Sequence, residues 1–116
     1  MKEKFDRGMK DHEWDVCGGK GGANLVYLLS SEDMAESVKI TEYRAVRLDK
    51  RASCGYHEVT AKAETYYIAC GEGVYRSTNG EFPVHEGDVV TCERGGSHGL
   101  TNTGDGFLTY VALVVE

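Results

Sequence analysis

The sequence contains few of the features that a membrane-spanning or secreted protein requires. Its longest apolar stretch, residues 108–115, is interrupted by Thr109 and is far shorter than the roughly 20 residues that cross a bilayer. The segment from Met1 to Arg7 lacks the apolar core of a secretory signal. We therefore expect a cytoplasmic protein that neither spans nor binds a membrane.

Proline and positive charge are scarce as well. Pro83 is the only proline among 116 residues, so no proline-rich linker divides the chain, and its length is that of one domain. Lys and Arg total 13 against 19 Asp and Glu, which gives a formal net charge of −6 at pH 7. A protein that binds nucleic acid neutralises phosphates with basic side chains, so we expect no nucleic-acid partner.

The cysteines form no recognisable pairing motif. Cys17, Cys54, Cys70 and Cys92 include no Cys-x-x-Cys pair, and a cytoplasmic chain with an adequate core needs no disulfide, so neither a disulfide framework nor a zinc ribbon is indicated. Cys54-Gly-Tyr-His57 has a Cys-x-x-His spacing, but a single short match of this kind arises easily by chance. We expect four buried or half-buried thiols that pack as small apolar side chains.

Glycine, by contrast, is abundant, and it separates short apolar segments. Such segments, rich in β-branched and aromatic residues, predict strands at residues 24–29, 38–48, 65–70, 73–76, 88–92 and 107–115. Asn79-Gly80 predicts a two-residue hairpin of type I′, and the glycine-rich residues 17–22 predict a turn. Only residues 30–36, with Ser30 as a capping residue, predict a short helix. Short strands separated by turns indicate an all-β sandwich or barrel.

Two segments of the sequence hold most of the side chains that could bind a metal. Residues 55–71 contain His57, Glu64 and Gly71, and residues 87–102 contain Gly87, Gly95, His98 and Asn102. Their spacing resembles the two motifs of the cupin superfamily, Gly-x5-His-x-His-x(3,4)-Glu-x6-Gly and Gly-x5-Pro-x-Gly-x2-His-x3-Asn. The chain is similar to small single-domain bacterial cupins of the conserved-barrel type.

This resemblance implies a fold and a division of the chain. It covers residues 38–116, which would form a cupin barrel, the double-stranded β-helix or jelly roll, with at most one short helix in the whole chain. Residues 1–37 would form an N-terminal extension and a strand that packs on the barrel. The family also implies a homodimer, and the apolar residues on both faces of the segment 107–115 fit a strand that is covered on both sides.

The sequence departs from the family pattern at three positions. Val59 stands at the second histidine, Arg51 at the opening glycine and Glu93 at the proline. The family's metal shell of three histidines and one glutamate is therefore reduced to His57, Glu64 and His98. Two imidazoles and a carboxylate suit Fe, Mn, Ni, Co or Zn as divalent ions, and such an ion would offset the burial of the carboxylate.

Other residues have weaker roles. Tyr66 shares pleat parity with Glu64 and so faces the interior, where it either packs in the core or contacts a ligand. Val59 and Tyr66 are the candidates for a substrate pocket. Gly71, Gly87, Gly95 and Asn102 are expected to form or cap turns. Arg44, Arg47 and Arg51 are candidates for reaching a carboxylate substrate.

The resemblance implies two classes of function. The first is a metal-dependent enzyme acting on a small polar metabolite, as an isomerase or epimerase, lyase, decarboxylase or dioxygenase. In such an enzyme Glu64 would orient the ion or act as the catalytic base. The alternative is a small-molecule-binding module without turnover, in which Val59 marks the loss of catalysis.

Overall fold

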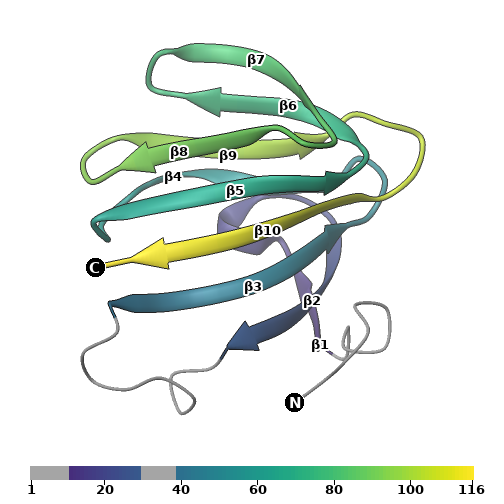
Figure 1. The fold of residues 1–116 in the computed structure, drawn as a ribbon. Coiled ribbons are helices and arrows are strands. Elements are labelled where there is room, and N and C mark those ends of the chain that lie inside the picture. The colour runs from purple at the N-terminus through teal and green to yellow at the C-terminus, as the bar shows by residue number, and fades with distance from the viewer. Residues whose placement is uncertain (1–10, 30–38) are drawn as a thin grey trace.

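The computed structural model describes residues 11–29 and 39–116 and consists of two antiparallel β-sheets (Figure 1). The elements are β1 (Asp11–Trp14), the 3₁₀ turn η1 (Val16–Gly18), β2 (Gly22–Leu29), β3 (Ile40–Leu48), β4 (Ser53–Glu58), β5 (Ala63–Cys70), β6 (Glu72–Ser77), β7 (Gly80–His85), β8 (Val89–Glu93), β9 (Ser97–Asn102) and β10 (Leu108–Val115). Among the described residues no helix is long and apolar enough to span a membrane.

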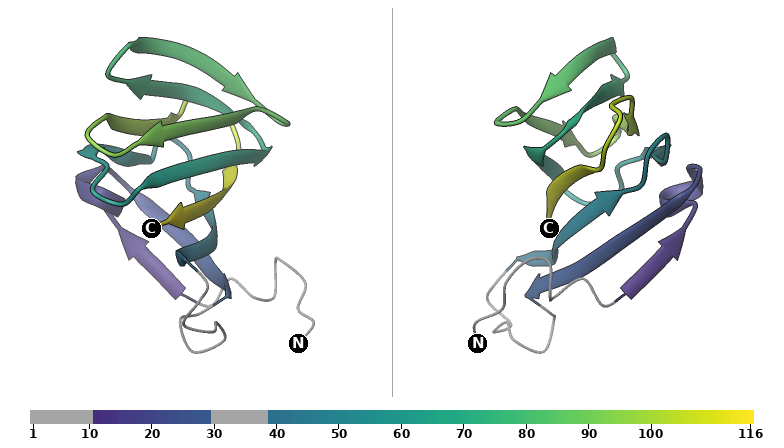
Figure 2. Two further views of the ribbon diagram at one scale, coloured as in Figure 1. Left: turned by 60° about the vertical axis from the view of Figure 1, so that its left-hand side comes forward. Right: turned by 90° about the vertical axis from the view of Figure 1, so that its right-hand side faces the viewer.

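From β3 onward the chain passes back and forth between the two sheets. One has the strand order β1-β2-β3-β10-β5-β8 and the other the order β4-β9-β6-β7, so that β10 lies between β3 and β5 in Figure 1. The turned views in Figure 2 place β1 and β2 at one end of the molecule and β6 and β7 at the other. This is the all-β jelly-roll barrel that the sequence predicts. Within the expected N-terminal extension, β2 pairs with β3 and so enters the larger sheet.

The core lies between the two sheets and is formed by the alternate side chains of each strand that point inward. Along β10, Leu108, Tyr110, Ala112 and Val114 face inward and are at most 8% exposed. Together with side chains from every strand from β2 to β9, the first three of these form a single buried cluster. Because inward positions alternate along each strand, a polar side chain at an inward position needs a partner within the barrel.

The structure contains strands that the sequence did not single out. β1, β4, β7 and β9 are rich in glycine or polar residues, and β7 contains Pro83, which is tolerated because β7 is an edge strand. The expected hairpin joins β6 to β7, but its type I′ turn is wrong. Ser77 pairs with Gly80, so Thr78 and Asn79 are the central residues, and Gly80 alone has a positive φ, of 121°. The short helix expected at residues 30–36 lies outside the described residues.

The thiols differ from the expectation. Cys54 and Cys92 are buried, but Cys17 and Cys70 are exposed, which corrects the prediction of four buried or half-buried thiols. Cys17 lies in the η1 turn rather than in a strand. Cys70 follows an irregularity in the pairing of β5 with β10, where its partner is Thr109 while that of Ile68 is the next residue along β10. One extra residue in β5 thus turns Cys70 away from the core.

Candidate metal centre

Three side chains from the two sequence motifs meet inside the barrel. His57 on β4 and His98 on β9 are directly paired, and their ring centroids lie 4.8 Å apart. Glu64 reaches them from β5 of the other sheet: its Oε1 lies 3.3 Å from Nε2 of His57 and 3.1 Å from Nε2 of His98. The structure therefore brings together all three expected metal ligands, with one potential ligand atom from each within 4.8 Å of the others.

Each imidazole is held in place through its other nitrogen. Nδ1 of His57 lies 2.8 Å from the carbonyl oxygen of Gly55, to which it donates a hydrogen bond. Nδ1 of His98 lies 2.8 Å from the hydroxyl of Tyr75, which is itself 2% exposed. In protein metal sites such partners fix the ring orientation and the tautomer, leaving Nε2 as the ligand atom.

The pKa values of His57 and Glu64 are shifted in opposite directions. Burial by itself would raise the pKa of Glu64, but its hydrogen bonds with His57 and His98 outweigh burial and lower the pKa to about 2. The hydrogen bond with Glu64 raises the pKa of His57 to about 9, although burial opposes this. At neutral pH the metal-free protein therefore holds an ion pair between the His57 imidazolium and the Glu64 carboxylate. Cation binding at these atoms requires that His57 release its proton.

A cavity of about 430 Å³ opens beside the cluster. Its lining includes His57, Glu64, Tyr66, Arg44 and Cys17. The side chains of His57 and Glu64 are 22% and 15% exposed. A small molecule can therefore reach the cluster from the side of these two residues, and the volume lies in the range of small-ligand sites.

Of the three arginines that the sequence offered, Arg44 lines this cavity. It forms an ion pair with Glu42, with 3.4 Å between Nε and the carboxylate oxygen. Burial would lower the pKa of Arg44, but the Glu42 carboxylate and other nearby groups outweigh burial and raise it. Arg47 lies over the ring of Phe107, with its guanidinium carbon 4.7 Å from the centroid, and Arg51 lines a different cavity.

The two residues expected at a substrate pocket are placed differently. Tyr66 lines the cavity, and its hydroxyl lies 3.4 Å from Oε1 of Glu64, to which it donates. Val59 is fully buried and is not among the described residues that line this cavity. Its backbone N–H donates to the carbonyl oxygen of Gly96 at 2.8 Å, and its own carbonyl accepts from the N–H of Gly95 at 3.0 Å. Val59 thus connects the end of β4 to the turn between β8 and β9.

Asn102 lies at the end of β9, and its side chain links the end of β3 to the loop between β9 and β10 by hydrogen bonds. Its Nδ2 donates to the carbonyl oxygens of Leu48, Asp49 and Gly106 at 3.3, 3.0 and 2.8 Å. Its Oδ1 accepts from the N–H of Gly104 at 3.0 Å. The side chain is 1% exposed, so these four contacts satisfy a buried amide that would otherwise be costly.

The motif glycines occupy backbone positions that favour glycine. Gly71, Gly87 and Gly95 have φ values of 90°, 92° and 90°. Gly71 joins β5 to β6, and a Cβ there would collide with the carbonyl oxygen of Phe107. Arg51 stands at the opening glycine of the motif and keeps a left-handed φ of 65°, an uncommon conformation for a side-chain-bearing residue.

Sequence reasoning missed two residues next to the cluster. Tyr75 contacts His98 because β6 pairs with β9, and no local pattern in the sequence predicts that pairing. Cys17 comes from the distant η1 turn and forms, with Cys54 and His57, a second group of potential metal ligands within 4.8 Å of one another. The signal for this group was the Cys54-x-x-His57 spacing.

Comparisons with known proteins identify the family. Residues 45–115 match the Cupin domain family. A protein of Thermotoga maritima called an oxalate-binding protein is 34% identical over 101 residues, covering 87% of this chain and 82% of the relative.

Solved structures share the fold over almost the whole chain. The crystal structure of a predicted oxalate decarboxylase from Thermotoga maritima aligns with a TM-score of 0.90 and 30% identity, covering 99% of this chain and 98% of that one. A polyketide cyclase from Streptomyces resistomycificus aligns with a TM-score of 0.79 over 99% of this chain and 79% of its own, but at 15% identity it shows the fold alone. The sequence match, the full-length structural similarity and the jelly-roll topology agree: the chain belongs to the cupin family.

Proposed function

We propose that this protein binds a small dicarboxylate of the oxalate type through a divalent transition-metal ion held by His57, Glu64 and His98. One observation carries the proposal: Nε2 atoms from two strands point at the same carboxylate oxygen of Glu64, at 3.3 and 3.1 Å, beside a cavity of about 430 Å³. Two imidazoles and one carboxylate are a ligand set for Fe, Mn, Ni, Co or Zn. Such an ion, when bound, supplies vacant coordination positions for a carboxylate.

The charges around the cavity explain why an anion would need the metal. Glu42, Glu58, Glu64 and Glu116 line it, whereas Arg44 is the one Lys or Arg side chain in the described lining. A dicarboxylate that enters the metal-free cavity therefore meets repulsion from several carboxylates. Arg44 supplies a guanidinium that can bind one carboxylate end, because its planar donors match that geometry. The name of the Thermotoga maritima oxalate-binding relative supports this ligand class.

The lowered pKa of Glu64 agrees better with ligand binding without turnover than with a role of Glu64 as a catalytic base. A catalytic base works best with a pKa near the working pH, whereas the pKa of Glu64 is lowered to about 2 by its two histidine partners, against the opposing effect of burial. At neutral pH this carboxylate has little affinity for a proton. We therefore propose that Glu64 orients the ion rather than accepting protons.

Decarboxylation is the second candidate function. The Tyr66 hydroxyl lines the cavity beside Glu64. In this reaction the C–C bond of oxalate would break, CO₂ would leave, the remaining carbanion would take the Tyr66 proton to give formate, and Tyr66 would regain a proton from water. Release of formate and CO₂ from oxalate by the metal-loaded protein would support this candidate. Unchanged oxalate after long incubation would leave binding as the function.

Isothermal titration calorimetry tests the binding proposal. Protein stripped with a chelator and dialysed is titrated with oxalate before and after loading with Mn(II) or Co(II), with acetate as the monocarboxylate control. We expect one oxalate to bind per metal-loaded chain and none to the stripped chain. The His98→Ala variant should lose both metal and oxalate, and Arg44→Gln should keep the metal and bind oxalate at least tenfold more weakly. Equal oxalate binding with and without metal would refute the proposal.

We also propose that the protein forms a homodimer through the outer face of its larger sheet. Four neighbouring apolar side chains on this face are partly or largely exposed, and they are Val26, Val111, Tyr67 and Val89. They lie beside Ala45, which is already buried in the single chain. Tyr67 and Val89 are 45% and 60% exposed in the single chain. Such an apolar surface gains free energy when a second copy covers it. The cytoplasmic location stays a prediction, in keeping with the four free thiols.

A further inference from the structure

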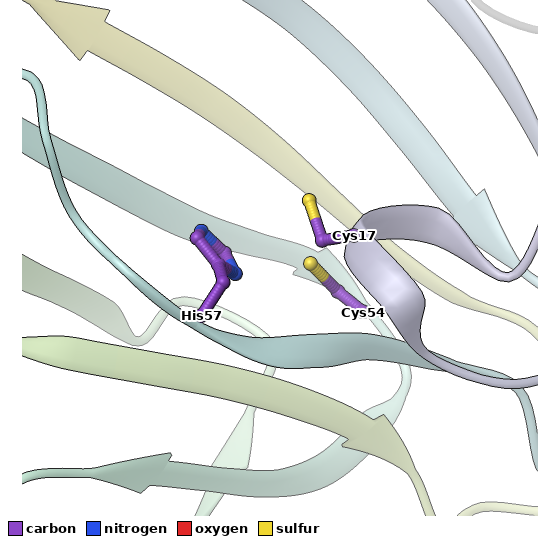
Figure 3. A group of neighbouring side chains, drawn as sticks. All are labelled: Cys17, Cys54 and His57. Carbon is purple, nitrogen blue, oxygen red and sulfur yellow. The ribbon is translucent and has the colours of Figure 1, made fainter.

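A second group of metal-ligating side chains adjoins the dicarboxylate site and shares His57 with it. The Sγ atoms of Cys17 and Cys54 and one ring nitrogen of His57 lie within 4.8 Å of one another. Figure 3 shows the two thiols side by side, one from η1 and one from β4, with the His57 ring facing them. The group combines two sulfurs and one nitrogen, so its chemistry differs from that of the two imidazoles and one carboxylate.

A bulge in β4 places Cys54 and His57 on the same face. In a regular strand, residues three apart point to opposite faces. Here Cys54 pairs with Leu100 and His57 with His98, so three steps along β4 match two steps along β9. The extra residue restores the parity of the two side chains, and bulges of this kind often redirect side chains beside functional sites.

The third member is held against β4 by a tightly fitted turn. Cys17 has a left-handed backbone, with φ 52° and ψ 34°, which is strained for a residue with a Cβ. The turn packs on β4 at a point where each of the two segments has a glycine. A Cβ on Gly19 would collide with the carbonyl oxygen of Ser53, and a Cβ on Gly55 would collide with the carbonyl oxygen of Cys17. Backbone hydrogen bonds fix it there, including Ser53 N–H to the carbonyl oxygen of Lys20 at 2.7 Å.

This group suits a different class of cation. Two thiolates and an imidazole select soft or borderline ions, whereas Mg²⁺ and Mn²⁺ prefer oxygen ligands. Around a tetrahedral zinc ion with zinc–sulfur bonds of about 2.3 Å, two sulfurs lie about 3.8 Å apart. Small side-chain movements therefore bring the three ligand atoms into zinc geometry. Cys17 is exposed and lines the same cavity as His57, which gives the ion a way in.

We propose that Cys17, Cys54 and His57 form a second metal site, which binds a thiophilic cation such as Zn(II) or Cu(I) and shares His57 with the dicarboxylate site. On binding Zn(II), the two thiols and the His57 ring each release one proton to solvent, two sulfur–zinc bonds and one nitrogen–zinc bond form, and water completes the fourth position. Because both sites need His57, a thiophilic ion here weakens metal binding at Glu64 and His98. The proposal does not depend on the ligand of the other site.

Cobalt spectroscopy distinguishes the two sites, because only a thiolate ligand gives a sulfur-to-cobalt charge-transfer band in the near ultraviolet. Metal-free protein in a phosphine reductant is titrated with Co(II). We expect the band to appear, to persist in His98→Ala, which disables the other site, and to vanish in Cys17→Ser. Cys70→Ser, which removes an exposed thiol at the end of β5, is the matched control and should retain the band. Addition of Zn(II) should remove the band, whereas Mg(II) should not.

Each other outcome overturns the proposal in a definite way. Absence of the band from the wild-type protein means that the thiols bind no cobalt. A band that persists in Cys17→Ser, or is lost in Cys70→Ser, places the thiolate elsewhere, and a band lost in His98→Ala shows that the site is not separate. Cys17 is exposed and its side chain fills no core space, so circular dichroism of Cys17→Ser should match that of the wild type. Oxalate binding by metal-loaded Cys17→Ser tests the dicarboxylate site independently.

Discussion

The protonation of His57 should make metal affinity depend steeply on pH. The hydrogen bond with Glu64 raises the pKa of His57 to about 9, and Glu64 stays ionised at any pH well above its own lowered pKa of about 2. A metal ion at Nε2 of His57 must therefore displace one proton at any pH below about 9. The apparent association constant should rise about tenfold per pH unit up to that value, so at pH 7 it is about 100-fold below its plateau, or roughly 2.7 kcal/mol.

The stability of the metal-free protein should follow the opposite trend. The folded pKa of His57 is raised, so its contribution to stability is complete below the ordinary value of 6.5 and is lost as the pH rises through about 9. The folded pKa of Glu64 is lowered, so its contribution is present above the ordinary value of 4.5 and is lost as the pH falls toward about 2. The pair thus stabilises the metal-free chain most between these two ordinary values. The rise in melting temperature on adding metal should accordingly grow from pH 6 to pH 8.

Calorimetry in paired buffers measures this proton directly. Titrations with Mn(II) at pH 6, 7 and 8, each in two buffers of different ionisation enthalpy, give the affinity and the number of protons released. We expect about a 100-fold gain in affinity from pH 6 to pH 8 and release of about one proton at pH 7 from His57. His85→Gln, which removes an exposed histidine far along the chain, should leave both values unchanged. An affinity that is constant over this range, with no proton released, would refute the reasoning.

Three further substitutions test the support of the site and of the fold. Tyr75→Phe removes the hydroxyl 2.8 Å from Nδ1 of the buried histidine, and calorimetry should show metal affinity 10- to 100-fold lower, whereas the exposed Tyr67→Phe should have no effect. Asn102→Ala removes four hydrogen bonds and should lower the free energy of unfolding by about 3 kcal/mol in urea titrations. Gly71→Ala combines a left-handed φ with a backbone collision and should destabilise the protein by at least about 2 kcal/mol, while Gly106→Ala, which meets open space, should stay within about 0.5 kcal/mol. A small effect of Gly71→Ala, or equal effects of the two tyrosine variants, would contradict these assignments.

The sequence predicts the barrel because several of its strands can be recognised from the alternation of apolar residues within the strand itself. The predicted strand at residues 107–115 appears as β10, and residues 65–70 lie within β5, because apolar residues at alternate positions face the core. β9 has no such signal: its sequence SHGLTN is mostly polar, yet His98 and Asn102 on it are buried and hydrogen-bonded. Its burial comes from pairing with β4 and β6, which only the tertiary structure defines.

The metal cluster was predictable for a different reason. Glu64 follows His57 by seven residues, but His98 lies 34 residues beyond Glu64, and no periodicity in this sequence relates the three. Their spacing is informative only because it resembles a family motif, in which fixed strand and turn lengths bring the same positions together. Tyr75 and Arg44 stand outside that motif, so their places beside the cluster emerge only once strand pairing is known.

The bulge in β4 shows why the Cys-x-x-His spacing could not be interpreted from sequence. In a regular strand that starts with Cys54 opposite Leu100, Tyr56 would stand opposite His98, and His57 would point away from the barrel interior. The extra residue places His57 opposite His98 and leaves Tyr56 44% exposed, while Cys54 keeps its place in the core. One backbone irregularity therefore creates both ligand groups that contain His57. If the unchanged sequence of β4 paired regularly with β9, Tyr56 would take the place opposite His98. The pairing of the two histidines and the approach of His57 to the thiols would then be lost together, which ties the two proposed sites to one local feature of the chain.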